Sequence, residues 1–446
     1  MRLKLPPKVI CVIQMLEQAG YEAYAVGGCV RDSILARTPG DWDITTSATP
    51  EQVKKIFART VDTGIEHGTV TVLQGRDGFE VTTYRLDGKY EDSRHPEEVT
   101  FTASLEEDLK RRDFTINAMA YNDHTGLIDL YGGMDDLQRK VIRCVGNPEE
   151  RFGEDALRML RAVRFAAQLG FSIEDDTAQA VRDKVETLAN ISAERIQVEI
   201  VKLLVSEHPE MWEMVYDLGI TRIVMPEFDE CMITPQKTPH HSYCVGEHIL
   251  RSVMEVPADK VLRLTMLLHD IAKPKCKVTD ETGRDHFYGH AAVSEKMARQ
   301  ILRRLKFDND TIGKVTKLIR YHDTRPDVVQ KQVRHLINQM GIELFPMYLA
   351  VRRADTLAQS GYMREEKMNR IDGVEAVYHE ILDKNECCSL NGLAINGGDL
   401  IEMGIAQGRE IGRLLNLALE LVLDYPEYNT RGYLLEFVKK EHGKIK

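Results

Sequence analysis

Residues 26–44 begin with side chains suited to binding phosphate. Gly27 and Gly28 end an apolar run and are followed at once by Arg31 and Asp32. Glycine lets a backbone N–H approach a ligand closely, and N–H groups at the start of a helix bind anions. The stretch therefore predicts a phosphate-binding loop that leads into a short helix.

A pair of carboxylates follows this loop at a spacing of two. If Asp41 and Asp43 lie on a strand, their side chains share one face. Adjacent carboxylates repel each other, and a divalent cation relieves the repulsion, with oxygen ligands favouring Mg²⁺. Asp-x-Asp alone is also common on solvated strands and in turns. Together with the glycine loop, it predicts metal-assisted nucleotidyl transfer.

A second polar cluster lies in residues 109–120, LKRRDFTINAMA. Arg112 offers a planar fork of donors that suits a triphosphate, and Asp113 and Asn117 can bond ribose hydroxyls. The alternative is a structural helix start with Asp113 as its cap.

Residues 148–165 predict one amphipathic helix that carries a base-recognition pair. Asp155 and Arg158 are three residues apart, so their side chains are neighbours on a helix. Cytosine and adenine both present an exocyclic amine beside a ring acceptor, and a carboxylate beside a guanidinium matches that order. Arg161 and Arg164 continue the spacing. The alternative is an ordinary surface ion pair. The predicted buried stripe is Met159, Leu160, Val163 and Ala167.

Residues 231–360 carry an ordered series of histidines and aspartates. Adjacent His and Asp on a helix direct two ligands at one cation, and distant His and Asp complete its shell. The predicted ligands are His248, His269, Asp270 and Asp355, and the candidates for a second divalent metal are His290 and His322. The series predicts a metal site that either hydrolyses phosphate esters or is intact but idle.

These motifs must be positioned by a small α+β unit. Apolar spacing predicts a helix over 8–19, and residues 24–26 predict a strand into the glycine loop. A helix is expected to open at 49–51, and strands at 68–74 and 79–85 flank a turn at 75–78. After residue 145 the pattern is helical.

The motifs resemble those of polymerase-β-like nucleotidyltransferases, specifically class II CCA-adding tRNA nucleotidyltransferases and bacterial poly(A) polymerases. Residues 111–118 are similar to the family's Arg-Arg-Asp-Phe-Thr-x-Asn-Ala, and residues 154–158 to its Glu-Asp-x-x-Arg. Residues 231–360 resemble the HD phosphohydrolase superfamily. The resemblance implies CCA addition to the 3′ end of tRNA from CTP and ATP.

The resemblance also implies a role for several residues. Asp41 and Asp43 are expected to hold Mg²⁺, and Glu80 is a candidate third acid, with an exposed strand residue as the alternative. The residues expected to bind the nucleotide are Gly28, Arg31, Arg112, Asp113, Asn117, Asp155, Arg158, Arg161 and Arg164. The polar stretch 86–99 resembles a loop required for adding the terminal A. In the tail, glycines at 404, 408 and 412 are expected to bring backbones close together.

Composition limits the class of protein. The chain has 446 residues with 43% hydrophobic and 29% charged residues, which is ordinary for a globular protein. A net charge of −11 argues against coating nucleic acid indiscriminately but allows a local basic track. No 18-residue apolar run and no Cys-x-x-Cys pair occur, so a cytoplasmic protein without a membrane partner or a zinc ribbon is expected.

The expected fold class is α+β, with a head of mixed or antiparallel sheet followed by an all-helical neck, body, HD domain and tail. The expected domains are 1–145, 146–230, 231–375 and 376–446. Two alternatives remain open at this point. One is an A-only or poly(A)-adding relative, and the other is an HD phosphohydrolase whose head senses nucleotides.

Overall fold

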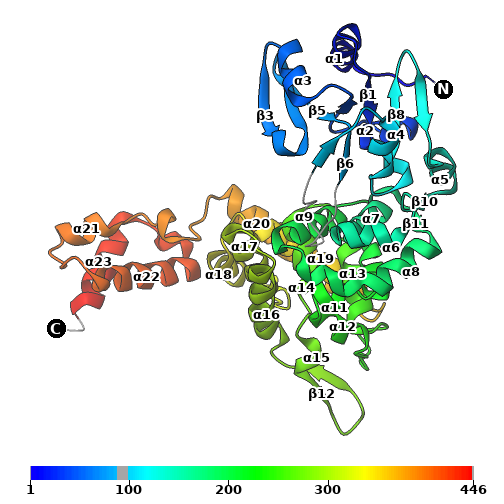
Figure 1. Cartoon of the computed structure of the whole chain (residues 1–446). Coiled ribbons are helices and arrows are strands. Elements are labelled where there is room, and N and C mark those ends of the chain that lie inside the picture. The colour runs from blue at the N-terminus through cyan, green and yellow to red at the C-terminus, as the bar shows by residue number, and fades with distance from the viewer. Residues whose placement is uncertain (1, 88–98, 444–446) are drawn as a thin grey trace. The chain divides into compact units, whose positions relative to one another are not determined.

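The chain divides at Asp229 into two compact units, Met1–Asp229 and Glu230–Lys446. The computed structural model describes residues 2–87 and 99–443 (Figure 1). The first unit holds a sheet and a helical segment, and the second is almost entirely helical. The expected fold class is thereby confirmed, and the finer boundaries at 145 and 375 remain predictions.

A seven-stranded sheet forms the centre of the first unit. Its order is β3-β4-β5-β2-β1-β8-β9, in which β2 and β5 are parallel and the other neighbours antiparallel. The strands are β1 (Ala23–Val26), β2 (Asp43–Thr46), β3 (Thr60–Gly64), β4 (Thr69–Gln74), β5 (Asp77–Thr83), β8 (Met119–Asn122) and β9 (Gly126–Asp129). The parallel pair brings segments far apart in the sequence into one register, and the site is built there.

Short helices and strands surround this sheet. Helix α1 buries Val9, Val12, Ile13 and Leu16, whose apolar spacing predicted the helix over 8–19, and that helix is confirmed. Helix α3 begins with a capping box between Thr49 and Gln52. The head helices are α1 (Pro7–Gln18), α2 (Gly28–Ile34), α3 (Pro50–Ile56), α4 (Leu105–Lys110) and α5 (Gly133–Arg139). The minor strands are β6 (Arg85–Asp87), β7 (Val99–Phe101), β10 (Val141–Ile142) and β11 (Ser172–Ile173).

Helices complete the first unit. They are α6 (Pro148–Glu154), α7 (Leu157–Leu169), α8 (Asp175–Lys184), α9 (Ala193–Leu204), α10 (Trp212–Asp217) and α11 (Thr221–Val224), and α12 (Glu227–Met232) spans the division. Helix α7 packs against α9. The predicted stripe of Met159, Leu160, Val163 and Ala167 is fully buried there, because its spacing matches the helical period.

The second unit contains eleven helices among its described residues. They are α13 (Val245–Met254), α14 (Lys260–Leu268), α15 (Lys273–Cys276), α16 (His290–Arg304), α17 (Asn309–Tyr321), α18 (Gln330–Met340), α19 (Phe345–Ala358), α20 (Arg364–Asp383), α21 (Gly397–Glu402), α22 (Arg409–Asp424) and α23 (Arg431–Gly443). A hairpin of β12 (Lys277–Thr279) and β13 (Asp285–Phe287) interrupts them.

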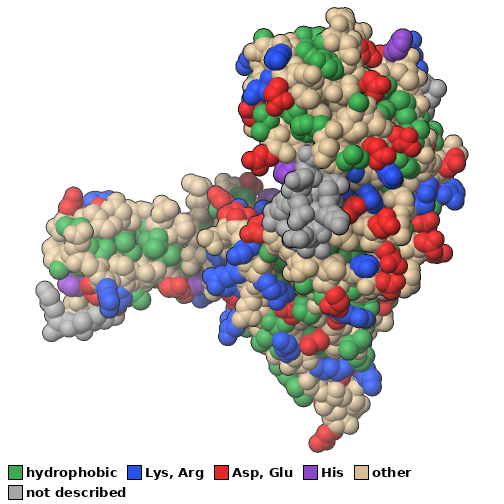
Figure 2. Space-filling model, viewed as in Figure 1, with side chains coloured by type: hydrophobic (Ala, Val, Ile, Leu, Met, Phe, Trp, Pro, Cys, Tyr) green, Lys and Arg blue, Asp and Glu red, His purple; other side chains and the backbone are tan. Residues whose placement is uncertain are grey.

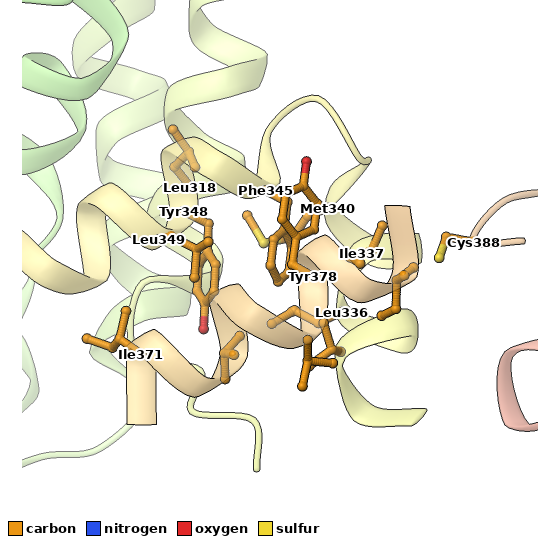
Figure 3. Close-up of a cluster of buried hydrophobic side chains, with 14 residues drawn as sticks. Leu318, Leu336, Ile337, Met340, Phe345, Tyr348, Leu349, Ile371, Tyr378 and Cys388 are labelled. Atoms are coloured by element: carbon orange, nitrogen blue, oxygen red, sulfur yellow. The ribbon is translucent and has the colours of Figure 1, made fainter. Parts of the chain in front are cut away.

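One apolar core of this unit joins α17, α18, α19 and α20 (Figure 3). Phe345 stacks on Tyr378 with ring centroids 4.9 Å apart and contacts Tyr348 at 5.4 Å. Leu349, Tyr348 and Ile371 lie at the end of the cluster away from Cys388 (Figure 3). Packing of this kind holds the helices in fixed positions, so polar side chains at their edges are held as well.

Basic and acidic side chains are interspersed over the face drawn in Figure 2, with Lys and Arg gathered over the region of α16 to α18. Within residues 2–87 and 99–443, no helix is long and apolar enough to cross a membrane.

The expectation for the tail glycines is wrong. A Cβ added at Gly404, Gly408 or Gly412 would meet no atom within 4 Å. Gly404 and Gly408 instead have φ of 84° and 149° in the connection from α21 to α22. Their role is backbone conformation, which only glycine adopts without strain.

Candidate functional site

The acidic residues of the head meet where β2 and β5 run parallel. Asp43 opens β2, and its register partner on β5 is Glu80. The packing of protein atoms around Asp43 raises its pKa, and the nearby Glu80 and Asp41 raise it further, while Arg112 opposes them. A divalent cation beside Asp43 would favour its ionised form, so Asp41, Asp43 and Glu80 are candidate oxygen ligands, although among the described residues their oxygens do not all lie within 4.8 Å of one another.

The strand prediction for this motif is wrong in one respect. Strand β2 begins at Asp43, so Asp41 and Trp42 precede it and the two aspartates do not share a strand face. Asp41 nevertheless lies close enough to Asp43 to raise its pKa. The two carboxylates are therefore brought near each other by the loop that ends at Asp43, and not by the two-residue period of a strand.

Gly27 is required where the glycine loop meets Arg112. It has a φ of 80°, and a Cβ there would lie 3.2 Å from Nη1 of Arg112 and 3.6 Å from the carbonyl oxygen of Asn117. Asp108 accepts a hydrogen bond from Nη2 of Arg112 at 3.2 Å. The carboxyl is fully buried, and Arg112 and Arg111 lower its pKa against the effect of burial. A buried anion thus holds Arg112 beside the loop.

The two other polar residues of the second cluster bond within the protein. Nη1 of Arg31 donates to Asn117 at 2.7 Å, and the amide of Asn117 donates to Asp113 at 3.3 Å. Arg161 donates two hydrogen bonds to Asp113, at 2.9 and 2.6 Å. Burial alone would raise the pKa of Asp113, but Arg161 lowers it to about 2. Contact of Asp113 and Asn117 with ribose remains a prediction.

The helix predicted over 148–165 is in fact two helices. Asp155 has φ −141° and ψ 102°, which ends α6, and its Oδ1 accepts from the backbone N–H of Leu157 at the start of α7. Asp is a favoured cap because its short side chain satisfies such N–H groups. Asp155 and Arg158 therefore do not share a helix face.

Asp155 is held instead by Arg195 of α9. Nη1 and Nη2 of Arg195 donate to its two oxygens at 3.2 and 2.7 Å. Arg158 pairs with Glu154 at 2.5 Å and also donates to the carbonyl oxygen of Arg111 at 3.1 Å. Both members of the predicted base-recognition pair are fixed in place, each by a separate partner.

Three charged residues of this site were missing from the sequence predictions: Asp108, Glu199 and Arg195. Glu154 was part of the predicted motif but had no role assigned to it. Glu199 is buried in α9 and accepts from Arg164 at 2.7 Å, which places Arg164 in the core of the neck. A glutamate at a core-facing position of an amphipathic helix indicates a paired charge, so this signal was present in the sequence.

The stretch 86–99, expected to act in A addition, lies largely outside the described residues. The structure describes only its base, where β6 and β7 pair with Leu86 opposite Thr100. Its role remains a prediction.

The histidines predicted to bind metal converge in the second unit. Nε2 of His248 lies 3.3 Å from Nε2 of His269. Oδ2 of Asp270 lies 3.4 Å from Nε2 of His248 and 3.2 Å from Nε2 of His269. Asp355 approaches from the other side, with Oδ1 3.1 Å from Nε2 of His248. All four side chains are buried.

The second predicted pair meets the other oxygen of the same aspartate. Oδ1 of Asp270 lies 3.3 Å from Nε2 of His290 and 3.5 Å from Nε2 of His322, and these nitrogens are 3.1 Å apart. Among the residues described, these two histidine pairs, each with Asp270, are the groups with ligand atoms close enough to hold a metal ion. Asp270 is placed to bridge two ions.

Backbone carbonyls fix the tautomer of each histidine. Each Nδ1 atom lies 2.7–3.3 Å from a backbone carbonyl oxygen. The pairs are His248 with Ala358, His269 with Met266, His290 with Phe287, and His322 with Ile319. A carbonyl accepts only, so Nδ1 carries the proton and Nε2 presents a lone pair. Lone pairs that face each other are satisfied by a cation, so this donor set fits two divalent metals.

Two further side chains at this centre were not predicted. Nζ of Lys273 lies 2.6 Å from Oδ2 of Asp270 and donates to Gln236 at 3.0 Å. The ring of His241 lies 4.8 Å from that of His248, and burial with the nearby Lys273 lowers its pKa to about 2. A cavity of about 350 Å³ opens at the cluster and is lined by Asp270, His290, His322 and Asp355 among others.

Comparison with known families matches three parts of the chain. Residues 23–143 match the poly A polymerase head domain, and residues 170–232 match a probable RNA and SrmB-binding site of polymerase A. Residues 286–438 match tRNA nucleotidyltransferase domain 2 (putative). The family models therefore cover both the head and the second unit.

Full-length relatives agree with these matches. The chain is 39% identical to a CCA-adding enzyme of Lactiplantibacillus plantarum over 96% of this chain and 94% of that protein. It is 37% identical to one of Levilactobacillus brevis over 91% and 90%. The crystal structure of the Bacillus stearothermophilus CCA-adding enzyme in complex with CTP matches with TM-score 0.73 at 30% identity, over 99% of this chain and 100% of that one.

A more distant structure agrees in fold alone. The Thermotoga maritima CCA-adding enzyme complexed with tRNA matches with TM-score 0.60 at 22% identity, over 99% of this chain and 100% of that one.

Proposed function

The chain belongs to the CCA-adding enzymes of the tRNA nucleotidyltransferase family, and from this premise we propose what its side chains do in each unit. The enzyme adds CCA to the 3′ end of tRNA, with tRNA, CTP and ATP as its partners. This activity replaces the two alternatives, an A-only or poly(A)-adding enzyme and a phosphohydrolase whose head senses nucleotides. The roles of single residues are the proposal.

Asp41, Asp43 and Glu80 would bind the metal of the head. Their oxygens do not all lie within 4.8 Å of one another among the described residues, so the ion would draw them together. The family works with a divalent metal, and the three oxygen-bearing side chains favour Mg²⁺. The bound cation would neutralise charge on the triphosphate and help the 3′-hydroxyl lose its proton. The observation that carries this role is the register of Asp43 with Glu80 beside Asp41.

The other side chains bind and orient the nucleotide. Gly28 at the start of α2 offers its backbone N–H to a phosphate, and Arg31 and Arg112 offer their guanidinium groups. Asp155 and Arg158 recognise the base, each held by its own partner. Arg161 and Arg164 act through Asp113 and Glu199, so we assign them to positioning and no longer to direct contact with the nucleotide.

Asp43→Asn tests the metal site of the head. The variant is expected to lose at least about a hundredfold in addition of both C and A, since several kcal/mol of transition-state stabilisation depend on the cation. Incorporation is measured on tRNAs ending before CCA, after C and after CC, together with tRNA binding, which should persist. The control is Asp62→Asn, an exposed aspartate on β3 of the same sheet. Addition within tenfold of the control would contradict the role.

We propose a second chemistry, hydrolysis of phosphate esters, for the centre around Asp270. The convergence of four Nε2 atoms on one carboxylate carries this proposal. In the reaction, water oxygen bonds to phosphorus, the ester P–O bond breaks, and the alcohol leaves with a proton. The bound divalent metals would polarise the phosphoryl group. Lys273, which pairs with Asp270 at 2.6 Å, would add positive charge near that group.

Metal content tests this centre directly. In an Asp43→Asn background, which removes the ion of the head, the chain is expected to carry two divalent ions after reconstitution with Mn²⁺. Adding Asp270→Asn should leave fewer than one, because both pairs share that carboxylate. His335→Asn is the control, since its ring pairs with Asp424 outside the cluster. Hydrolysis of p-nitrophenyl phosphate should fall with the metal. Two retained ions in Asp270→Asn would refute the bridging role, and full metal without hydrolysis would indicate an idle site.

A further inference from the structure

A second cavity adjoins the His/Asp centre and has no part in the functions above. It has a volume of about 230 Å³ and lies between α19 and α20. His240 and Arg325 line both this cavity and the one at the metal ligands. A ligand that reached the metal centre could therefore extend past these two side chains.

The floor of the second cavity is apolar and rigid. Tyr348, Leu349, Ile371 and Val374 line it, and all four are less than 6% exposed. They belong to the core cluster that joins α17 to α20, and Figure 3 shows Tyr348, Leu349 and Ile371 at one end of it. A preformed apolar surface binds a flat organic group without a cost in ordering the protein.

The rim of the cavity is cationic. Four basic side chains line it, against Glu366 as its one carboxylate: Arg325, Arg352, Lys367 and Arg370. Arg325 and Arg370 are anchored at one side by Asp323 at 2.7 Å and by Asp327 at 3.9 Å. Arg352 also pairs with an aspartate, Asp355, at 3.6 Å. Among the described rim cations, Lys367 is therefore the one whose polar partners are all uncharged, and an anionic ligand is favoured beside it.

Lys367 lies at the centre of this charge. Its Nζ donates to Oε1 of Gln359 at 2.8 Å and contacts Nδ1 of His240 at 3.2 Å, which are both uncharged partners. Partial burial lowers the pKa of Lys367, and Arg325 lowers it further. The same neighbours act on His240, whose pKa is lowered by burial, Lys367 and Arg325. An anion placed among these groups would relieve their mutual repulsion.

The rim is also connected to the metal ligands. The amide of Gln359 donates to Oδ2 of Asp355 at 3.0 Å, and Oδ1 of Asp355 lies beside His248. Arg352 donates to the carbonyl oxygen of His322 at 2.7 Å. The two anion-binding positions, the metal centre and the cationic rim, are thus parts of one continuous structure.

We propose that this second cavity is a nucleoside subsite of the His/Asp centre, and that its ligand is a nucleotide carrying two phosphates. One phosphate lies at the metal centre, the other at Lys367, Arg325 and Arg370, and the nucleoside lies on the apolar floor. Such a ligand uses both parts of the cavity, since inorganic phosphate leaves the floor empty and a nucleoside leaves Lys367 with uncharged partners only. The inference rests on the proposed second function only for the identity of the neighbouring centre.

The test is calorimetric titration of the chelator-treated, full-length protein with adenosine 3′,5′-bisphosphate, adenosine and inorganic phosphate. Without metal no hydrolysis occurs, so binding at this cavity is measured whether or not the centre is a hydrolase. Lys367→Met is expected to weaken bisphosphate binding at least tenfold relative to its control, Lys384→Met, an exposed lysine at the end of the same helix. Arg112→Ala removes binding at the head and should leave this component unchanged.

Each outcome decides the proposal. Equal binding in Lys367→Met and Lys384→Met overturns the site. Phosphate that binds as tightly as the bisphosphate overturns the nucleoside part. If Lys367→Met unfolds below the assay temperature, Arg370→Met replaces it, because that side chain is exposed and its loss must weaken binding as well. Failure of p-nitrophenyl phosphate hydrolysis would refute the second function and leave this binding result standing.

Discussion

Replacing Asp155 with Ala should change which nucleotide the enzyme uses. The structure gives this carboxylate three hydrogen bonds, two from Arg195 and one from the N–H of Leu157. A carboxylate has about four acceptor positions, so one position on Oδ2 remains for the exocyclic amine shared by C and A. U presents a carbonyl at that place and is rejected by the unpaired acceptor.

The magnitude follows from the cost of a mispaired polar group. Such a group costs about 1–3 kcal/mol when buried, which corresponds to roughly tenfold to hundredfold in preference. Asp155→Ala should therefore lower the CTP:UTP and ATP:GTP ratios by that factor. The lost cap adds a separate stability cost of about 1 kcal/mol, which lowers the thermal midpoint without altering the ratios.

Single-turnover incorporation of all four nucleotides measures the ratios, and thermal unfolding measures the cap. Arg195→Met is the companion variant, because it leaves the carboxylate in the sequence but removes its two anchoring bonds. It should reduce the same ratios by a smaller factor. Ratios unaltered in both variants, with lowered stability, would refute the reasoning and leave Asp155 as a helix cap.

The remaining predictions concern the glycine loop and the neck. Gly27→Ala should weaken CTP binding at least tenfold, since its Cβ would lie 3.2 Å from Arg112. The control is Gly126→Ala, which has a similar φ of 83° and no neighbour within 4 Å, so it shares only the backbone strain. Equal CTP affinity in the two variants would contradict the contact. Asp113 has its pKa lowered to about 2, so its pair with Arg161 contributes about 2 kcal/mol of stability above pH 4 that is lost as the pH falls toward 2. Denaturant unfolding at pH 4.0 and 2.5 (about the range of this titration) should show a smaller acid loss in Asp113→Asn than in wild type, and parallel losses would exclude the pair as the cause.

Local features of this protein followed from the sequence. The helical period placed the stripes of α1 and α7, and a proline in the first turn placed the start of α3, because these signals depend on residues within a few positions of each other. The order of His and Asp residues predicted the members of the metal cluster, and the motif resemblance predicted the family.

The break at Asp155 had a local signal that the helical period concealed. Asp is a poor interior residue and a good cap, so the sequence allowed both a continuous helix and two helices. The two helices are accompanied by a contact that the local sequence does not contain, because Arg195, 40 residues further along the chain, binds the carboxylate of Asp155 where α6 ends.

The tertiary structure alone decided the pairings between distant segments. The register of β2 with β5 brings Glu80 to Asp43, and burial of Asp108 holds Arg112 at the glycine loop. The four Nε2 atoms converge because backbone carbonyls from three helices and one strand fix each ring. Spacing in the sequence carries no information on such contacts, since they are set by how whole elements pack and by which buried charges must find a partner.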